Sequence, residues 1–146
     1  VGEVDAETAE LLRVTKESLY KGIAAAVDGA RVGDIGHAVQ SYAESFGFGV
    51  VRELEGHGIG TQMHESPGIP NYGRQGHGPK LRNGMTICIE PMITAGSRNV
   101  YLDKNGWAVH TADHRNAAHY ELTVVVRKGH AEQLSTFEYI ENSVKF

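Results

Sequence analysis

The sequence predicts an α+β domain in which two helices come first and antiparallel strands follow. Two segments near the start carry apolar residues at steps of three and four, which is the spacing of an amphipathic helix. From residue 85 onward apolar and polar residues alternate, as in a strand with one buried face, and an Asn-Gly pair marks a tight hairpin. Helices followed by strands, rather than alternating with them, are typical of α+β architecture.

The first expected helix begins at Asp5, whose carboxylate suits an N-cap, and ends near Gly29. One of its faces carries four apolar residues, Leu12, Leu19, Ile23 and Val27. A second helix is expected after Gly33 and Asp34, and Gly47 stops it. Its apolar stripe, which we interpret as core rather than as a cofactor site, comprises Ile35, Ala38, Val39, Tyr42, Ala43 and Phe46.

A glycine-rich stretch follows the helices. Gly56, Gly58 and Gly60 alternate around His57, and glycines at this spacing do not suit a helix or the interior of a strand. His57 is therefore expected on backbone that either turns sharply or lets another group approach closely. A second histidine, His64, follows seven residues later. Two histidines in a solvated loop would need no function, but the carboxylates described below favour a site.

The strands are expected in the second half of the chain, after one short strand near the glycines. They cover residues 49–54, 85–90, 100–102, 107–109 and 118–127. An Asn105-Gly106 turn joins the third of these to the fourth. Residues 66–79, rich in glycine and proline, are predicted to be a loop, and residues 134–146 a terminal tail.

Two glutamates on these strands suggest a metal site. Glu121 lies among apolar residues, so its charge must be neutralised by a proton, by an ion pair or by a cation, and the last two remain equally open for Glu121 alone. Glu90 stands at a strand end. Together with His57 they form a carboxylate-rich, imidazole-poor set, which favours manganese, iron or cobalt over a closed structural zinc site. Such a site would support hydrolysis by an activated water.

Composition limits the classes of function. The 146 residues suit a single domain, 1–146, with a core that needs no disulfide. The net charge is −4 and the 14 basic residues are scattered, so neither nucleic acid nor a membrane surface is an expected partner. The single cysteine, Cys88, and the lack of a leader-like segment predict a reducing, cytoplasmic location.

Four separate blocks of the sequence resemble one family. They are Gly56-His57-Gly58-Ile59-Gly60 with His64-Glu65-x-Pro67, the run from Gly84 to Ile93, Gly106-Trp107-x-Val109-x-Thr111-x-Asp113, and Ala118-His119-Tyr120-Glu121. Their order and spacing resemble the catalytic half of the type I methionine aminopeptidases, over nearly the whole chain to about Leu134. Proline-specific relatives share the first block, but Ile89-Glu90-Pro91-Met92-Ile93 and Gly106-Trp107 favour the methionine enzymes.

The resemblance implies two divalent metal ions per complete site, of manganese, iron, cobalt or zinc. His57 and Glu90 would bind one ion, and Glu121 would bridge both. Glu90 would also accept a proton from the attacking water. His64 would contact the scissile peptide and stabilise charge that develops on its oxygen.

Two further residues fall where the family lines its methionine pocket. These are Met63 and Trp107, for which plain core packing is the alternative. The histidine that usually follows the last glutamate is Leu122 here, a change that we expect the site to tolerate.

Part of the family's site is not found in this sequence. Two aspartate ligands on adjacent strands and another catalytic histidine come from an N-terminal half, and Asp103 and Asp113 belong instead to the hairpin region. The expected architecture is therefore the C-terminal half of the pita-bread fold, with two helices on a curved, mainly antiparallel sheet. We expect a fragment, a split enzyme or a nicked one, whose partner could be a separate N-terminal half.

The predicted function is a metal-dependent aminopeptidase that removes the N-terminal methionine from peptides and nascent proteins. The alternative is a non-catalytic module of the same fold that binds polypeptide ends or a protein partner. Joint retention of His57, His64, Glu90 and Glu121 disfavours the module, because binding alone does not require a metal-ligating carboxylate on a strand.

Overall fold

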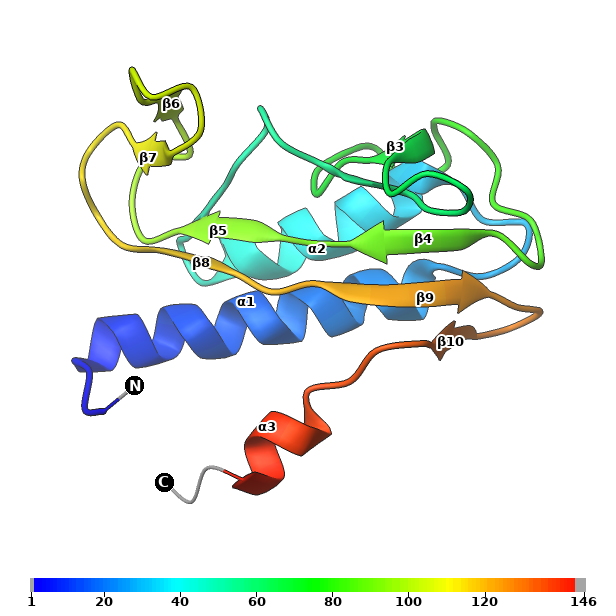
Figure 1. The fold of residues 1–146 in the computed structure, drawn as a ribbon, viewed down its shortest axis with the longest axis horizontal. Coiled ribbons are helices and arrows are strands. Elements are labelled where there is room, and N and C mark those ends of the chain that lie inside the picture. Colours follow the sequence, from blue (N-terminus) through cyan, green and yellow to red (C-terminus); the bar gives the residue numbers. More distant parts are fainter. Residues whose placement is uncertain (1, 144–146) are drawn as a thin grey trace.

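The computed structural model describes residues 2–143. It confirms the α+β prediction, with two long helices on one side of antiparallel sheets (Figure 1). The predicted tail, 134–146, lies partly outside the described residues. The described part of this tail contains a short helix, α3, Glu138–Ser143. Its Glu141 forms an ion pair with Lys16.

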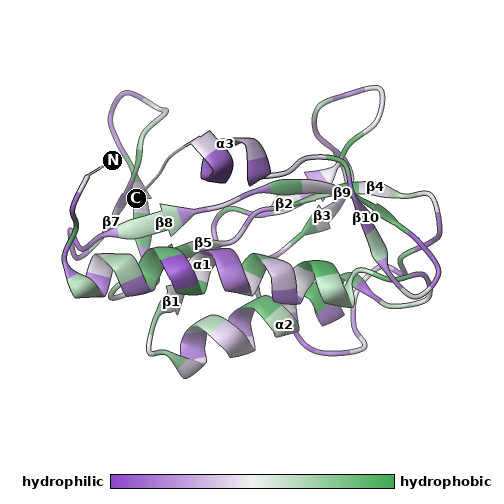
Figure 2. Cartoon of the chain, turned by 90° about the horizontal axis from the view of Figure 1, so that it is seen from below, coloured by the Kyte–Doolittle hydropathy of each residue, from purple (hydrophilic) through white to green (hydrophobic). Residues whose placement is uncertain are grey.

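The helices are α1, Ala6–Ala25, and α2, Val32–Ser45, and they pack together on one side of the strands (Figure 2). Asp5 caps α1 as predicted, because its side chain accepts a hydrogen bond from the Thr8 amide at 2.7 Å. The helix ends four residues before Gly29, however. Val27 leaves it to form a bridge with Arg127, and the Asp28 amide donates to the Arg127 carbonyl.

The buried face of α1 is rotated from the predicted one. Leu12, which belongs to the apolar face identified from the sequence, is 38% exposed, whereas Leu19 and Ile23 on the same face are buried. The face that packs between α2 and the strands is centred on smaller residues, including Thr15, Ser18 and Gly22. Phe46 is also exposed rather than core, because it lies just past the end of α2.

Within residues 2–143, ten strands form three antiparallel sheets. One has the order β10-β9-β4-β2-β3, a second β1-β5-β8, and the third is the hairpin β6-β7. The strands are β1 Gly49–Val50, β2 Gly56–Gly58, β3 Glu65–Ile69, β4 Thr86–Ile89, β5 Met92–Thr94, β6 Val100–Leu102, β7 Val109–Thr111, β8 Ala117–His119, β9 Leu122–Val126 and β10 Ala131–Gln133.

Four predictions about the strands and the loop between them need correction. The strand over 49–54 is only two residues long, because residues after Val51 bend away from β5. The predicted loop 66–79 contains most of β3, which pairs with β2 and closes the edge of the five-stranded sheet. The hairpin turn at Asn105-Gly106 is confirmed, but Trp107 and Ala108 belong to the turn, where both amides donate to the Asn105 side chain.

The fourth correction concerns the strand predicted over 118–127. It is two strands, β8 and β9, with Tyr120 and Glu121 between them. The chain makes a matching break between β4 and β5, at Glu90 and Pro91. Figure 1 shows β4 continuing into β5 and β8 into β9 across this break. The paired strands thus pass from the five-stranded sheet into the three-stranded one.

The core lies between the helices and one face of the strands. Its larger cluster joins α1 and α2 to β4 and β9, through residues that include Leu19, Ile23, Ile35, Ile87, Ile89, Leu122, Val124 and Val126. Because side chains alternate along a strand, the opposite face of β4 and β9 carries the intervening residues.

None of the helices in residues 2–143 has the length and apolar character of a membrane span.

Asp34 provides a pH test of how α2 is anchored. Its carboxylate accepts hydrogen bonds from the amides of Gly76 and Arg31, both at 2.7 Å, and these bonds lower its pKa. A carboxyl group whose pKa is lowered by folding stabilises the protein above its ordinary pKa, and this stabilisation is lost as the pH falls through the folded value. We expect Asp34→Asn to cost roughly 1–3 kcal/mol at neutral pH.

The variant should also lose less stability than the parent between neutral pH and about pH 3. Urea unfolding at both pH values measures this difference. Glu3→Gln is the control, because Glu3 is exposed and makes no side-chain hydrogen bond within residues 2–143. Equal acid sensitivity of the parent and Asp34→Asn would contradict the anchoring role.

Candidate metal centre

The candidate centre lies on the face of the strands opposite the helices. His57 of β2 is paired in register with Cys88 of β4, and Cys88 is paired with Thr123 of β9. Glu90 and Glu121 follow two positions away along β4 and β9, so alternation places them on the same face. The seam between the two sheets therefore gathers side chains from three strands.

The two glutamates occupy opposed positions in this seam. The register pairs Ile89 with Leu122 on one side of the break and Met92 with His119 on the other. The same register, continued through the break, sets Glu90 opposite Glu121. Like charges directly opposite one another destabilise a strand pair unless something neutralises them. This arrangement suits a cation between the two carboxylates.

The glycines around His57 permit close approach, which was one of the two predicted possibilities. A Cβ atom on Gly56 would lie 2.3 Å from the Cys88 carbonyl oxygen, and one on Gly58 would lie 2.5 Å from that of Ser66. Both contacts are with backbone, so no larger residue fits without moving a strand. The glycines thus hold β2 tightly between β3 and β4 and fix the position of His57.

The orientation of the His57 ring suits metal binding. Its Nδ1 lies 2.9 Å from the Gly58 carbonyl oxygen, which can only accept, so Nδ1 carries the proton. The metal-binding lone pair of the neutral ring would then be on Nε2, which lies 3.6 Å from Glu90 Oε1. Histidines that bind metals usually donate their second N–H to a carbonyl or carboxylate in this way.

Glu90 lies at the centre of the cluster. Its second oxygen, Oε2, is 3.3 Å from His119 Nε2, and its side chain is only 14% exposed. Donor atoms of Glu90, His119 and Glu121 all lie within 4.8 Å of one another, as do donor atoms of His57, Cys88 and Glu121. Glu121 belongs to both groups.

The environment of Glu121 differs from the prediction. The residue is exposed and lies in the break between β8 and β9, so it is not embedded in an apolar strand. Within residues 2–143, neither Glu121 nor Glu90 is paired with an arginine or lysine, and Glu90 is paired only with histidines. The ion-pair alternative is therefore not observed in the described part of the chain.

His64 lies beside His57, with ring centroids 4.3 Å apart, and its side chain is exposed. The structure therefore brings His57, His64, Glu90 and Glu121 together. Met63 and Trp107 are 70% and 88% exposed, so they are not core residues. Trp107 lies in the turn of the β6-β7 hairpin, which is a separate sheet from those that carry the cluster.

Sequence reasoning missed two members of the cluster. His119 stands in one of the four sequence blocks but was given no role, because its partner Glu90 lies far away in the sequence. Cys88 was considered only for its redox state. Burial is the main cause that raises the pKa of its thiol, whose sulfur lies 3.4 Å from Thr123 Oγ1. The cluster of donor groups therefore contains more imidazole than predicted, because His119 joins His57.

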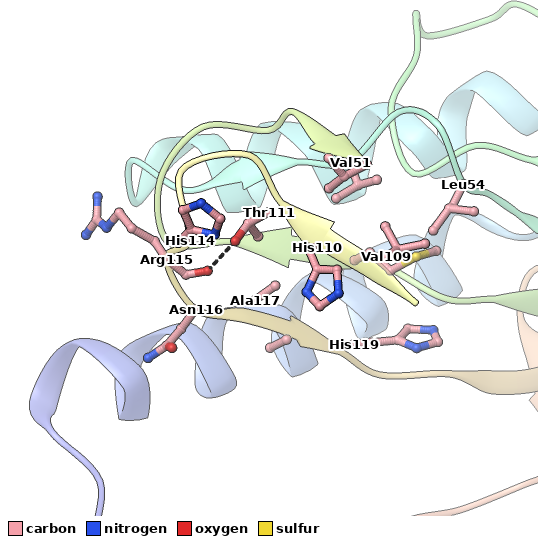
Figure 3. A pocket seen from close by; sticks show the side chains of 13 residues that line it. Val51, Leu54, Val109, His110, Thr111, His114, Arg115, Asn116, Ala117 and His119 are labelled. Atoms are coloured by element: carbon pink, nitrogen blue, oxygen red, sulfur yellow. Dashed lines mark hydrogen bonds between the residues drawn. The ribbon is translucent and has the colours of Figure 1, made fainter. Parts of the chain in front are cut away.

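A cavity of about 530 Å³ borders the cluster between the hairpin and β8 (Figure 3). His119 and Met92 connect its wall to the centre, and His110, His114 and Arg115 lie farther along it. Thr111 closes part of this wall by donating to the Arg115 carbonyl oxygen. The cluster is thus open to a ligand on the side of His119.

Comparison with known proteins places this architecture among metal-dependent peptidases. Residues 1–128 match the model of metallopeptidase family M24. The chain belongs to this family, and membership implies that divalent metal ions take part in its chemistry. The donor set fits such ions, because carboxylate oxygens and imidazole nitrogens lie close together in two groups that share Glu121, and the His57 ring is already oriented.

The similar proteins include several methionine aminopeptidases. One from Clostridium acetobutylicum is 51% identical over 138 residues, which cover 94% of this chain and 55% of that protein. The crystal structure of methionine aminopeptidase from Thermotoga maritima matches with a TM-score of 0.89 and 46% identity, over 92% of this chain and 54% of that one. This match confirms the expected pita-bread fold. The chain spans about half the length of these relatives.

A more distant match shows the fold alone. Prolidase from Pyrococcus furiosus has a TM-score of 0.70 at 24% identity, over 93% of this chain and 34% of that one. The proline-specific relatives anticipated from the first sequence block thus share the architecture but are much less similar in sequence.

Asn71 holds the backbone of Glu90. Its Nδ2 donates to the Glu90 carbonyl oxygen at 3.0 Å, and its side chain is fully buried. Asn71→Ala would leave that carbonyl without this donor, so we expect a loss of roughly 1–3 kcal/mol of stability. Urea unfolding measures it, with the exposed Asn83→Ala as the matched control. Equal stability of the two variants would show that Asn71 does not hold Glu90.

Proposed function

We propose that this chain forms the second half of the catalytic domain of a methionine aminopeptidase and hydrolyses the N-terminal methionine from peptides and nascent proteins. The convergence of His57, His64, Glu90 and Glu121 on one strand face carries this proposal. Relatives at about half identity that bear this name support it. No observation favours the alternative of a non-catalytic binding module.

The metal-binding residues in this proposal are His57, Glu90 and Glu121. They would hold two divalent ions, of manganese, iron, cobalt or zinc, together with ligands from another half of the domain. Such ions lower the pKa of a bound water and polarise a carbonyl group. Glu121 suits a bridging role because its carboxylate belongs to both groups of converging donor atoms.

Glu90 would act as a proton acceptor and His64 as a hydrogen-bond donor. The carboxylate of Glu90 is mostly shielded from solvent and opens toward the cluster, so it can accept a proton from the attacking water. His64 is exposed beside His57, where its ring can donate a hydrogen bond to the peptide oxygen as negative charge develops there. The ring would stabilise the transition state more than the bound substrate.

Met63 and Trp107 remain proposed contacts for the methionine side chain. Their exposure leaves both apolar surfaces free for a ligand or for another part of the enzyme.

The predicted cytoplasmic location and the predicted lack of nucleic-acid partners stay predictions.

A two-piece reconstitution tests the function. One polypeptide is this 146-residue chain, and the other is the part of the C. acetobutylicum enzyme that the chain does not cover. We expect negligible methionine release from a Met-Ala peptide by this chain alone, in manganese or cobalt. The mixture should release methionine, because the second piece is proposed to supply the missing aspartate ligands.

Glu121→Gln is the matched inactive control in the same mixture. It keeps the size of the side chain but removes the charge that is proposed to bridge the ions. Methionine release by the Glu121→Gln mixture at the parent rate would refute the assignment. So would full activity of the 146-residue chain alone, which would require a different ligand set.

His64→Ala separates transition-state contact from metal binding. We expect kcat of the reconstituted enzyme to fall about a hundred-fold to a thousand-fold, which is typical for the loss of one such donor. Metal content should be unchanged. His130→Ala, in the exposed turn between β9 and β10, is the control. Loss of metal with normal turnover of the remaining metallated enzyme would make His64 a ligand instead.

A further inference from the structure

His119 is the one histidine beside Glu90 to which the proposed function gives no role. It ends β8, two positions before Glu121, and its Nε2 lies 3.3 Å from Glu90 Oε2. The other oxygen of the same carboxylate faces His57 at 3.6 Å. Glu90 is thus held between two imidazoles that come from different sheets.

The spacing of these atoms suits a shared ion. Two ligand atoms bound to one zinc or cobalt ion lie roughly 3–3.5 Å apart, because each bond is about 2.0–2.2 Å long. The distance between His119 and Glu90 already has this value. The Glu121 carboxylate completes the group, with all three donor atoms within 4.8 Å of one another, so a small rotation of exposed side chains would close it.

The His119 ring is free to make that rotation. Its side chain is 48% exposed and borders the cavity, as Figure 3 shows. In the described part of the chain, the ring makes its polar contact with Glu90. On the same face of β8, two positions earlier, Ala117 carries only a methyl group beside the ring.

We propose that His119 is a further metal ligand, which with Glu90 and Glu121 forms a position that holds one divalent ion on this chain's own residues. The inference rests on the metal site of the proposed function but adds a ligand to it. An added imidazole shifts the donor set toward nitrogen, so this position prefers zinc or cobalt to manganese.

A simpler role for His119 is to donate a hydrogen bond to Glu90 and position it. Two variants distinguish the roles. His119→Ala removes both the hydrogen bond and the ligand. His119→Gln keeps an N–H donor for Glu90 but replaces imidazole with a much poorer metal ligand. If His119 only positions Glu90, glutamine restores metal binding; if it binds the ion, glutamine does not.

The matched control is His110→Ala. His110 lines the same cavity and is equally exposed, at 49%, but faces Asp103 at 3.8 Å rather than the cluster. All variants change exposed side chains, and circular dichroism verifies that they fold.

Calorimetric titration of the metal-free 146-residue chain with zinc, cobalt and manganese measures the effect. We expect both His119 variants to weaken zinc and cobalt binding by at least about ten- to a hundred-fold, and to weaken manganese binding less. His110→Ala should bind as the parent does. Parent-like zinc affinity of His119→Gln would overturn the proposal.

Nitrogen NMR of the histidine rings tests ligation directly. The chain has eight histidines, and the His119 signals are assigned by their loss in His119→Ala. We expect Nε2 of His119 and of His57 to shift when zinc is added, whereas the His110 nitrogens stay in place. A shift of His57 without one of His119 would also overturn the proposal.

Neither measurement requires turnover. Failure of the two-piece reconstitution together with His119-dependent zinc binding would refute the aminopeptidase but retain the ligand. Active reconstitution with zinc binding independent of His119 would do the reverse.

Discussion

The candidate centre depends on an interruption in a strand ladder. Proline has no amide hydrogen, so Pro91 cannot donate to the strand beside it. The chain instead makes one long contact there, from the Tyr120 amide to the Pro91 carbonyl oxygen at 3.4 Å. Regular pairing resumes at Met92 and His119. The gap leaves two opposed carboxylates close to each other, and a cation between them would relieve their repulsion.

Much of this arrangement could be predicted from sequence, because it follows from period-two alternation. The apolar faces of β4 and β9 and the placement of Glu90 at a strand end are confirmed. The exposure of Glu121 could not be predicted in this way, since the break beside it is caused by a proline on another strand. Local pattern alone made 118–127 look continuous.

The same limit explains the other features that the sequence did not predict. The partner of His119 lies on a strand that is remote in sequence, and only the register brings the two together. The rotation of the buried face of α1 depends on where α2 packs, and its small residues carry little hydrophobic signal. By contrast, the glycines around His57 were informative, because few backbone environments require three of them.

The central strands have two functions that cannot be separated. Ile89 and Leu122 face the helices, while Glu90 and Glu121, their immediate neighbours, lie at the seam. A slip of one residue in the pairing would expose the apolar side chains and push charge into the core. Burial of the core therefore selects the one alignment in which the donors meet. A molecule that has closed its interior has therefore already brought the proposed metal ligands together.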